Sequence, residues 1–573
     1  MTEPDGAHAL GAPSFDLTLR PWIGVLRDDG AHDEVSLRQL FAQAGNLRRI
    51  VGDLPTQEFA LLRLLLAIAH DALDGPRDLD EWHDLWADEN CFDGVEAYLD
   101  VHRERFDMLH PTVPFFQTAG LRTAKGEMFS LNRLVADVPN GDPFFTSRMP
   151  TVERLTLAEA ARWLVHAHAY DTSGIKSGAV GDERVKSGKV YPLGTGWAGT
   201  LGGVFVEGAT LRETLLLNLI AADADALETA GSDRPAWRAQ PCGPGGGERT
   251  PNGLLDLYTW QSRRVRLHYD ADGVHGVVLG YGDPLTPRNL HRREPMTAWR
   301  RSPAQEKKLG RSPVYLPREH DPARTAWRGI AALVADRTDN GQGPEAPPYL
   351  RPGILEWIAE LVTEQALPRG FLVRARLIGA TYGTQQSVID EVVDDDLAMP
   401  VVLLHRQDRT CARQAIGAAE DADLAVRALG DLATDLARAA GGEGEGARLA
   451  AREHAFAALE NPYRTWLAAL GDAEDPFERR RHWQRDAHRI LSRLGNRLIT
   501  AAGEAAWQGR TVTGPKGTHW LNTGLADTWF RTRLAKALGQ AGTEAQPDPS
   551  VSTLPASDST DPQQPPTDTK ALA

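Results

Sequence analysis

The sequence has little cysteine and no long apolar run, and each shortage excludes a class of protein. Its 573 residues include only three cysteines, Cys91, Cys242 and Cys411. They lie too far apart for a disulfide framework or a paired-cysteine zinc site. The longest apolar stretch, residues 61–69, contains Arg63 and has about half the length that a membrane-spanning helix needs. The N-terminus lacks the basic and apolar segments of a signal peptide, so we expect a soluble, cytoplasmic protein.

Motifs of nucleotide-dependent and hydrolytic enzymes are also missing. Neither a GxxxxGK[ST] phosphate loop nor a GxSxG nucleophile motif occurs. Residues 194–199 match the dinucleotide fingerprint GxGxxG, in which the third glycine must lead into a helix that binds the pyrophosphate. The following residues, 201–206, are typical of a strand instead. We therefore reject a dinucleotide site.

One enzyme hypothesis stays open as an alternative. His70-Asp71, and His83-Asp84 nearby, match the HD dyad of metal-dependent phosphohydrolases. That chemistry needs a further histidine and a distal aspartate, which spacing alone does not supply. His166 and His168 lie two residues apart on a predicted helix, so they face different directions, unlike metal ligands four residues apart.

Charge is unevenly distributed along the chain. The net charge of −15, from 63 basic and 78 acidic residues, argues against nucleic acid when it is averaged over the whole chain. Residues 288–328, however, hold eleven basic and four acidic residues, with Trp299, Tyr315 and Trp327 interleaved. Such a mixture suits a groove that follows a nucleic-acid backbone. The alternative is a solvated loop region that its aromatic residues anchor to the core.

Hydrophobic spacing divides the chain into two parts. Towards the N-terminus we predict a strand within residues 15–26, a helix over 57–73 capped by Thr56, and a helix that starts at the capping box Thr156–Glu159. Amphipathic helices over 418–440, 447–470, 476–500 and 525–538 predict an antiparallel four-helix bundle. The fold class is α+β. The expected divisions are a flexible N-terminus (1–13), a large irregular mixed α/β domain (14–404), the bundle (405–540) and a disordered acidic tail (541–573).

Four segments together resemble one family. They are residues 15–23 (FDLTLRPWI), 112–118 (TVPFFQT), 214–220 (TLLLNLI) and 379–387 (GATYGTQQS), followed by the predicted bundle. In order and spacing they are similar to CasA, the large subunit of the type I-E CRISPR surveillance complex Cascade. The resemblance covers roughly residues 14 to 540, and it implies the same division into an irregular α/β domain and a four-helix bundle.

The resemblance implies a non-catalytic, DNA-binding subunit. Members of the family read the protospacer-adjacent motif (PAM) of duplex DNA from the minor groove, help open the duplex for the guide RNA, and dock a helicase–nuclease. The implied partners are the guide RNA, the backbone and small subunits, target DNA and the helicase–nuclease, with no membrane. Some members carry cysteine pairs in the middle region that suggest a metal. This chain has only Cys242 there, so we expect no metal and no cofactor.

The resemblance also implies four sets of contact residues. A glycine-rich loop lets backbone approach base edges, a basic finger enters the minor groove, a hairpin wedge splits the first base pairs, and a further loop meets the guide RNA and a neighbouring subunit. Gly379 and Gly383 are expected to free the wedge turn, and Lys186–Gly188 repeats the Lys-Ser-Gly of the loop. The residues that match are Thr172, Ser173, Gly174 and Lys176 (loop), Arg288 or Arg292 (finger), Thr384, Gln385 and Gln386 (wedge), and Phe144, Phe145 and Arg148 (RNA and subunit contact). A protein–protein scaffold without nucleic-acid contact is the second alternative.

Overall fold

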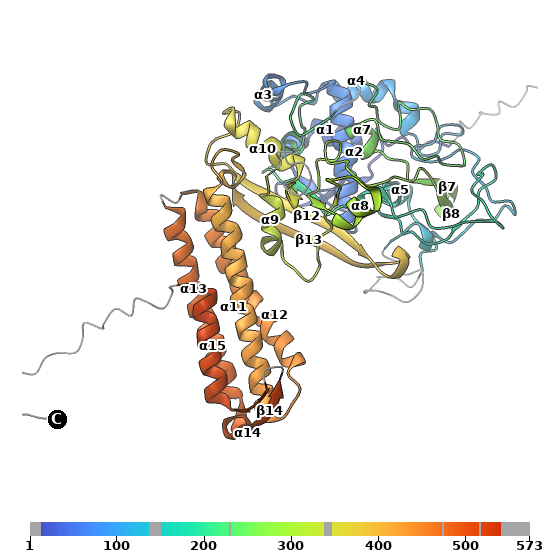
Figure 1. Ribbon diagram of the computed structural model, residues 1–573. Coiled ribbons are helices and arrows are strands. Elements are labelled where there is room, and N and C mark those ends of the chain that lie inside the picture. Colours follow the sequence, from blue (N-terminus) through green and yellow to red (C-terminus); the bar gives the residue numbers. More distant parts are fainter. Residues whose placement is uncertain are drawn as a thin grey trace, which may run out of the picture.

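A computed structural model describes residues 13–136, 151–228, 231–336, 346–472, 475–514 and 517–539. They form a mixed α/β body followed by an antiparallel four-helix bundle, as the sequence predicts (Figure 1). The expected acidic tail and nearly all of the expected flexible N-terminus lie outside these residues. No helix of the described part is long and apolar enough to cross a membrane.

A buried helix organises the body. Helix α2 (Pro55–Leu73) follows the predicted 57–73 pattern, and its side chains from Phe59 to Ala69 are all buried. The predicted cap at Thr56 is wrong, because Pro55 occupies the first turn and Leu54 is the N-cap without a side-chain hydrogen bond. The Thr56 hydroxyl instead lies 3.0 Å from Nε2 of the buried His166.

Helix α5 (Leu157–Tyr170) packs beside α2. It begins at the predicted capping box, in which Thr156 and Glu159 each accept a hydrogen bond from the other's backbone N–H. His166 and His168 both lie in the core, where burial lowers their pKa to about 3 and about 4. His166 therefore joins α5 to α2 as a neutral imidazole, whereas Nε2 of His168 lies 2.8 Å from the Phe116 carbonyl.

Three-stranded and two-stranded sheets surround these helices. The first sheet has the order β2-β1-β3, and the strand expected within residues 15–26 begins only at Ile23. A second sheet, β13-β12-β6, is dominated by one long antiparallel hairpin. The strands of the body are β1 (Ile23–Arg27), β2 (His32–Val35), β3 (Leu47–Ile50), β4 (Lys176–Ser177), β5 (Lys189–Val190), β6 (Gly203–Val206), β7 (Arg263–Asp270), β8 (Gly273–Tyr281), β9 (Trp299–Arg301), β10 (Tyr315–Pro317), β11 (Tyr349–Leu350), β12 (Leu372–Tyr382) and β13 (Ile389–Pro400).

Shorter helices fill the remaining faces of the body. Most are one to three turns long, and they connect strands or cover sheet edges. They are α1 (Leu37–Ala42), α3 (Leu79–Ala87), α4 (Gly94–Val101), α6 (Leu211–Leu217), α7 (Leu254–Tyr258), α8 (Pro303–Leu309), α9 (Ile330–Leu333) and α10 (Gly353–Thr363).

The bundle consists of four long helices and an addition that the sequence analysis did not predict. The long helices are α11 (Thr410–Ala440), α12 (Glu445–Ala468), α13 (Pro476–Ala501) and α15 (Thr523–Ala537). Between α13 and α15 lie α14 (Gly503–Gln508) and a hairpin of β14 (Arg510–Gly514) and β15 (Gly517–Leu521), at the end of the bundle far from the body (Figure 1). The alternation in Thr511-Val512-Thr513 was the available signal for this hairpin.

The bundle is fastened to the body through strand β13. Arg464 of α12 pairs with Asp395 of β13 at 2.7 Å, and the Trp327 indole N–H donates to Glu460 at 2.7 Å. The Trp327 ring also stacks on Tyr463, with centroids 4.4 Å apart. The bundle therefore holds the hairpin near the middle of β13.

Glu360 on α10 is a half-buried carboxyl group whose ionisation should make the stability of the protein depend on pH. Burial, reinforced by Asp225, raises its pKa to about 7. The unfolded carboxyl ionises near pH 4.5, so between that pH and about 7 it is charged in the unfolded chain and protonated in the folded chain. The stabilisation of the folded chain by the protonated group is therefore complete below pH 4.5 and is lost as pH rises through 7. We expect Glu360→Gln to raise the free energy of unfolding by about 1–3 kcal/mol at pH 8 and little at pH 4.5, measured by urea denaturation. Exposed Glu364→Gln is the control, and an equal gain at both pH values would contradict the explanation.

Candidate nucleic-acid interface

The predicted wedge residues lie at the tip of the β12–β13 hairpin. Gln385 and Gln386 have left-handed backbone angles (φ 58° and 55°), and both side chains are exposed. The turn closes through a hydrogen bond from the Gln386 N–H to the Gly383 carbonyl at 2.8 Å. Such strain in two adjacent non-glycine residues costs of order 1–3 kcal/mol each and is typical of functional sites.

Only one of the two expected turn glycines takes part in this turn. A Cβ on Gly383 would lie 2.5 Å from a carboxylate oxygen of the exposed Asp390, so that side chain would have to move to admit any other residue. Gly379 instead lies within β12 opposite Val393, and the expectation that it frees the turn is wrong. There is little room for a side chain at Gly379, because an added Cβ would lie 3.2 Å from a ring carbon of His320.

The glycine-rich loop meets the wedge directly. The backbone N–H of Ser173 donates to the Gln386 carbonyl at 2.7 Å. On its other side, the Ser173 hydroxyl accepts from the Gly194 N–H at 3.0 Å, and the Tyr281 hydroxyl donates to the Gly174 carbonyl at 2.7 Å. A Cβ on Gly174 would meet nothing within 4 Å, so this backbone faces open space. Loop and wedge form one continuous surface.

A buried charge cluster supports the loop from beneath. Lys176 is 9% exposed, and its ammonium lies 2.7 Å from the Asp171 carboxylate. Arg263 of β7 pairs with the same carboxylate and donates to the carbonyls of Thr172 and Gly194 at 3.1 and 3.0 Å. Burial would raise the pKa of Asp171, but the two cations hold it below its ordinary value. Lys176 thus braces the loop from inside.

Sequence reasoning did not identify Arg263, Asp171 or Tyr281 as site residues. The available signal was the pair Arg263-Arg264 at the start of a strand in which apolar and polar residues alternate, because a buried arginine needs anionic or carbonyl partners. The repeated Lys-Ser-Gly at 186–188 forms a turn just before β5, the second arm of a small hairpin in which β5 pairs with β4; the Gly178 N–H donates to the Gly188 carbonyl at 2.9 Å.

The predicted basic finger follows β8, directly after Pro287, a residue that lines the same cavity as Gln386. Arg288 is half-buried and Arg292 is exposed, and neither forms an ion pair within the described chain. Within residues 288–328, other basic side chains are used internally: Arg301 pairs with Glu306 at 2.6 Å and Arg328 with Asp423 at 3.5 Å. Among the described residues of this stretch, the basic side chains without an ion pair are Arg288, Arg292, Arg300, Lys307, Lys308, Arg311 and Arg318.

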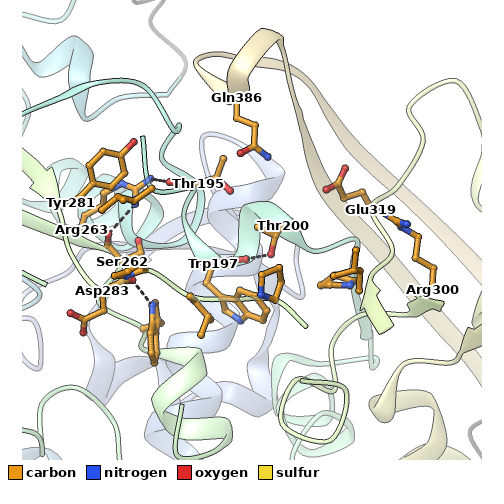
Figure 2. A pocket seen from close by; sticks show the side chains of 18 residues that line it. Thr195, Trp197, Thr200, Ser262, Arg263, Tyr281, Asp283, Arg300, Glu319 and Gln386 are labelled. Carbon is orange, nitrogen blue, oxygen red and sulfur yellow. Dashed lines mark hydrogen bonds between the residues drawn. The ribbon is translucent and has the colours of Figure 1, made fainter. Parts of the chain in front are cut away.

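A cavity of about 340 Å³ opens beneath Gln386 (Figure 2). Its wall is formed by residues 193–200, by the start of β7 and the end of β8 with the residues next to them, and by part of the basic stretch. Burial raises the pKa of Glu319 at its edge, against the opposing effect of Arg300. The lining residues are Leu193, Gly194, Thr195, Trp197, Thr200, Trp260, Ser262, Arg263, Tyr281, Asp283, Pro284, Leu285, Pro287, Arg300, Leu316, Pro317, Glu319 and Gln386.

The residues of the HD alternative do not form a metal site in the described chain. His70 is buried, its Nδ1 lies 3.2 Å from the Gly75 carbonyl, and burial lowers its pKa to about 4. Asp71 is occupied by Tyr98 and by Arg238 at 2.7 Å. No cluster of three or more His, Cys, Asp or Glu suited to a metal occurs among the described residues. Phe144, Phe145 and Arg148 lie outside those residues.

Comparisons with known proteins agree on one family. A family model described as CRISPR-associated protein Cse1 matches residues 16–494. A curated CasA/Cse1 protein of Thermus thermophilus is 33% identical over 331 residues, which span 56% of this chain and only 60% of that relative. The crystal structure of Thermobifida fusca Cse1 is 58% identical with a TM-score of 0.84, covering 92% of this chain and 98% of that one. Cse1 from Acidimicrobium ferrooxidans is 31% identical with a TM-score of 0.78, covering 94% and 99%.

Proposed function

Because this chain belongs to the Cse1 family of CRISPR-associated proteins, we propose that it is the non-catalytic large subunit of a type I-E RNA-guided surveillance complex. In this role it recognises a PAM in duplex DNA from the minor groove, opens the first base pairs, and docks a helicase–nuclease. Its partners are a guide RNA and the backbone and small subunits. A chain with the same fold is described as part of a CRISPR RNA-guided surveillance complex.

The observation that carries the proposal is the hydrogen bond between the Ser173 N–H and the Gln386 carbonyl. It joins a loop with open backbone at Gly174 to a strained, exposed polar turn, and unpaired arginines lie nearby. A bare backbone suits close approach to base edges, and polar tips suit insertion beneath them. The acidic remainder of the chain leaves most phosphate contacts to its partners, so the isolated chain binds DNA weakly.

The test is binding by the assembled complex to duplexes in which the motif positions are varied. Each unfavourable base pair costs about 1–3 kcal/mol in a specific interface, while degenerate minor-groove readout tolerates related motifs. We expect a small group of motifs to be bound and opened. Equal binding to every motif would favour the scaffold alternative, and stoichiometric metal with phosphodiesterase activity in the isolated chain would favour the HD enzyme.

Charge reversal at the basic finger gives a separate prediction. Arg288→Glu with Arg292→Glu will weaken duplex binding by the complex and flatten the slope of log K against log salt by about 2, because each phosphate contact contributes about one unit. Filter binding at several salt concentrations measures both quantities. Arg493→Glu with Arg497→Glu, two exposed residues with the same spacing on α13, is the control. An unchanged slope would remove the finger from the DNA path.

A further inference from the structure

The cavity beneath Gln386 has the dimensions and the wall of a small-ligand site. Its volume of about 340 Å³ lies within the range of about 300–1,000 Å³ that is usual for such pockets. The indole N–H groups of Trp197 and Trp260 are bound elsewhere, to Glu294 at 2.8 Å and to the Asp283 carbonyl at 2.9 Å. The rings therefore contribute apolar surface to the wall rather than polar atoms.

One polar atom in this wall lacks a partner. Thr195 is 9% exposed, and its hydroxyl makes no hydrogen bond to any described residue. Figure 2 shows the side chain at the upper part of the cavity, on the side of Gln386. A buried hydroxyl without a partner is unfavourable, so its position calls for a ligand atom that completes it.

Resting on the proposed function, we infer that this cavity receives one unpaired nucleobase from the base-pair step that the wedge opens. Opening a step leaves bases without partners, and enzymes that extrude bases hold them by stacking on aromatic or apolar side chains and by hydrogen bonds to the exposed edge. Here Trp197 and Trp260 supply the apolar wall and Thr195 supplies the edge contact. Arg300, at the mouth, supplies a cation for the adjoining phosphate.

This capture would hold the duplex open. An unpaired base that is free in solution can re-pair as soon as the wedge withdraws, whereas a base held in the cavity cannot. The wedge and the cavity share Gln386, so insertion of the turn and departure of the base take place at the same position.

Permanganate footprinting of the assembled complex tests the inference, because permanganate oxidises unpaired thymines that solvent can reach. Substrates carry thymine at the first position beside the motif, on one strand or the other. In the wild-type complex, we expect opened thymines further along to react while one thymine at the first position is protected. Filling the cavity with Thr195→Leu will make that thymine about tenfold more reactive, the change expected from losing a buried hydrogen bond.

Control variants separate the possible outcomes. Thr286→Leu makes the same change at an exposed neighbouring residue and will keep the protection, while Thr195→Val removes the hydroxyl with little change of shape and will weaken it. If all opened thymines react equally in the wild type, the cavity assignment is wrong although opening stands. If no thymine reacts, duplex opening itself is contradicted, and the cavity with it. Binding of free thymidine monophosphate that Thr195→Leu abolishes, without a protected DNA thymine, would assign the cavity to a free nucleotide and overturn the inference.

Discussion

Replacing Gln385 and Gln386 together by alanine will slow the opening of a motif-bearing duplex by about ten- to a hundredfold, while the complex still assembles. Both side chains are exposed at the hairpin tip, so their loss leaves the core of the body unchanged. Insertion between base steps must offset a few kcal/mol of unstacking, and each 1.4 kcal/mol that is lost slows a step about tenfold. The rate is measured by the fluorescence of 2-aminopurine placed in the first base pairs.

The matched control for this variant lies elsewhere in the same domain. Gln365 is also exposed and also left-handed, with φ 64°, so Gln365→Ala removes the same side chain from a similarly strained backbone. Glycine at both wedge positions relieves the strain but also removes the amides, so it will open DNA as slowly as the alanine variant. Opening at the normal rate in the alanine variant would refute the wedge assignment.

Replacing Arg263 by alanine will lower the free energy of unfolding by about 3–5 kcal/mol and abolish discrimination between motifs. Arg263 is 2% exposed and pairs with the Asp171 carboxylate, so truncation removes one partner of a buried ion pair. The same guanidinium holds the carbonyls of Thr172, in the glycine-rich loop, and of Gly194, which bonds to Ser173 of that loop. Urea denaturation measures the first effect, and binding of motif and non-motif duplexes measures the second.

Two further variants distinguish positioning from simple loss of stability. Arg266→Ala, on the same strand, removes a half-buried arginine. Its one described hydrogen bond, to the Leu121 carbonyl, is long at 3.4 Å. We therefore expect this variant to lower the free energy of unfolding by less than about 1 kcal/mol. Arg263→Lys keeps the charge but cannot reach several carbonyls at once, so it will recover stability better than motif discrimination. A folded Arg263→Ala chain that still discriminates between motifs would contradict a positioning role for Arg263.

Local patterns in the sequence determined the helices and several boundaries. The capping box at Thr156 started α5 as predicted, and the spacing of leucines and tryptophans identified the four long helices of the bundle. The strand after residue 200 was also predicted, which correctly excluded the dinucleotide site. These features depend on contacts between residues a few positions apart, and such contacts can be read from periodicity.

The order of the segments along the chain also identified the family. Hairpin β14–β15 was missed because its strands are short, and the cap of α2 was misplaced because a proline competed with Thr56 for the first turn. The second error concerns an element end, where several local solutions have similar free energies.

Only the tertiary structure decided how the candidate interface is assembled. Arg263 and Asp171 are 92 residues apart in the chain, and no periodicity links them. The same holds for the contact of Ser173 with Gln386 and for the burial of Lys176, a residue whose type alone suggests a surface cation. A buried charge must be neutralised by whatever the fold brings beside it, so its role follows from packing rather than from its own sequence neighbourhood. The sequence by itself thus determined most of the elements and the family, and packing determined which side chains of the candidate interface are exposed and which support it from within.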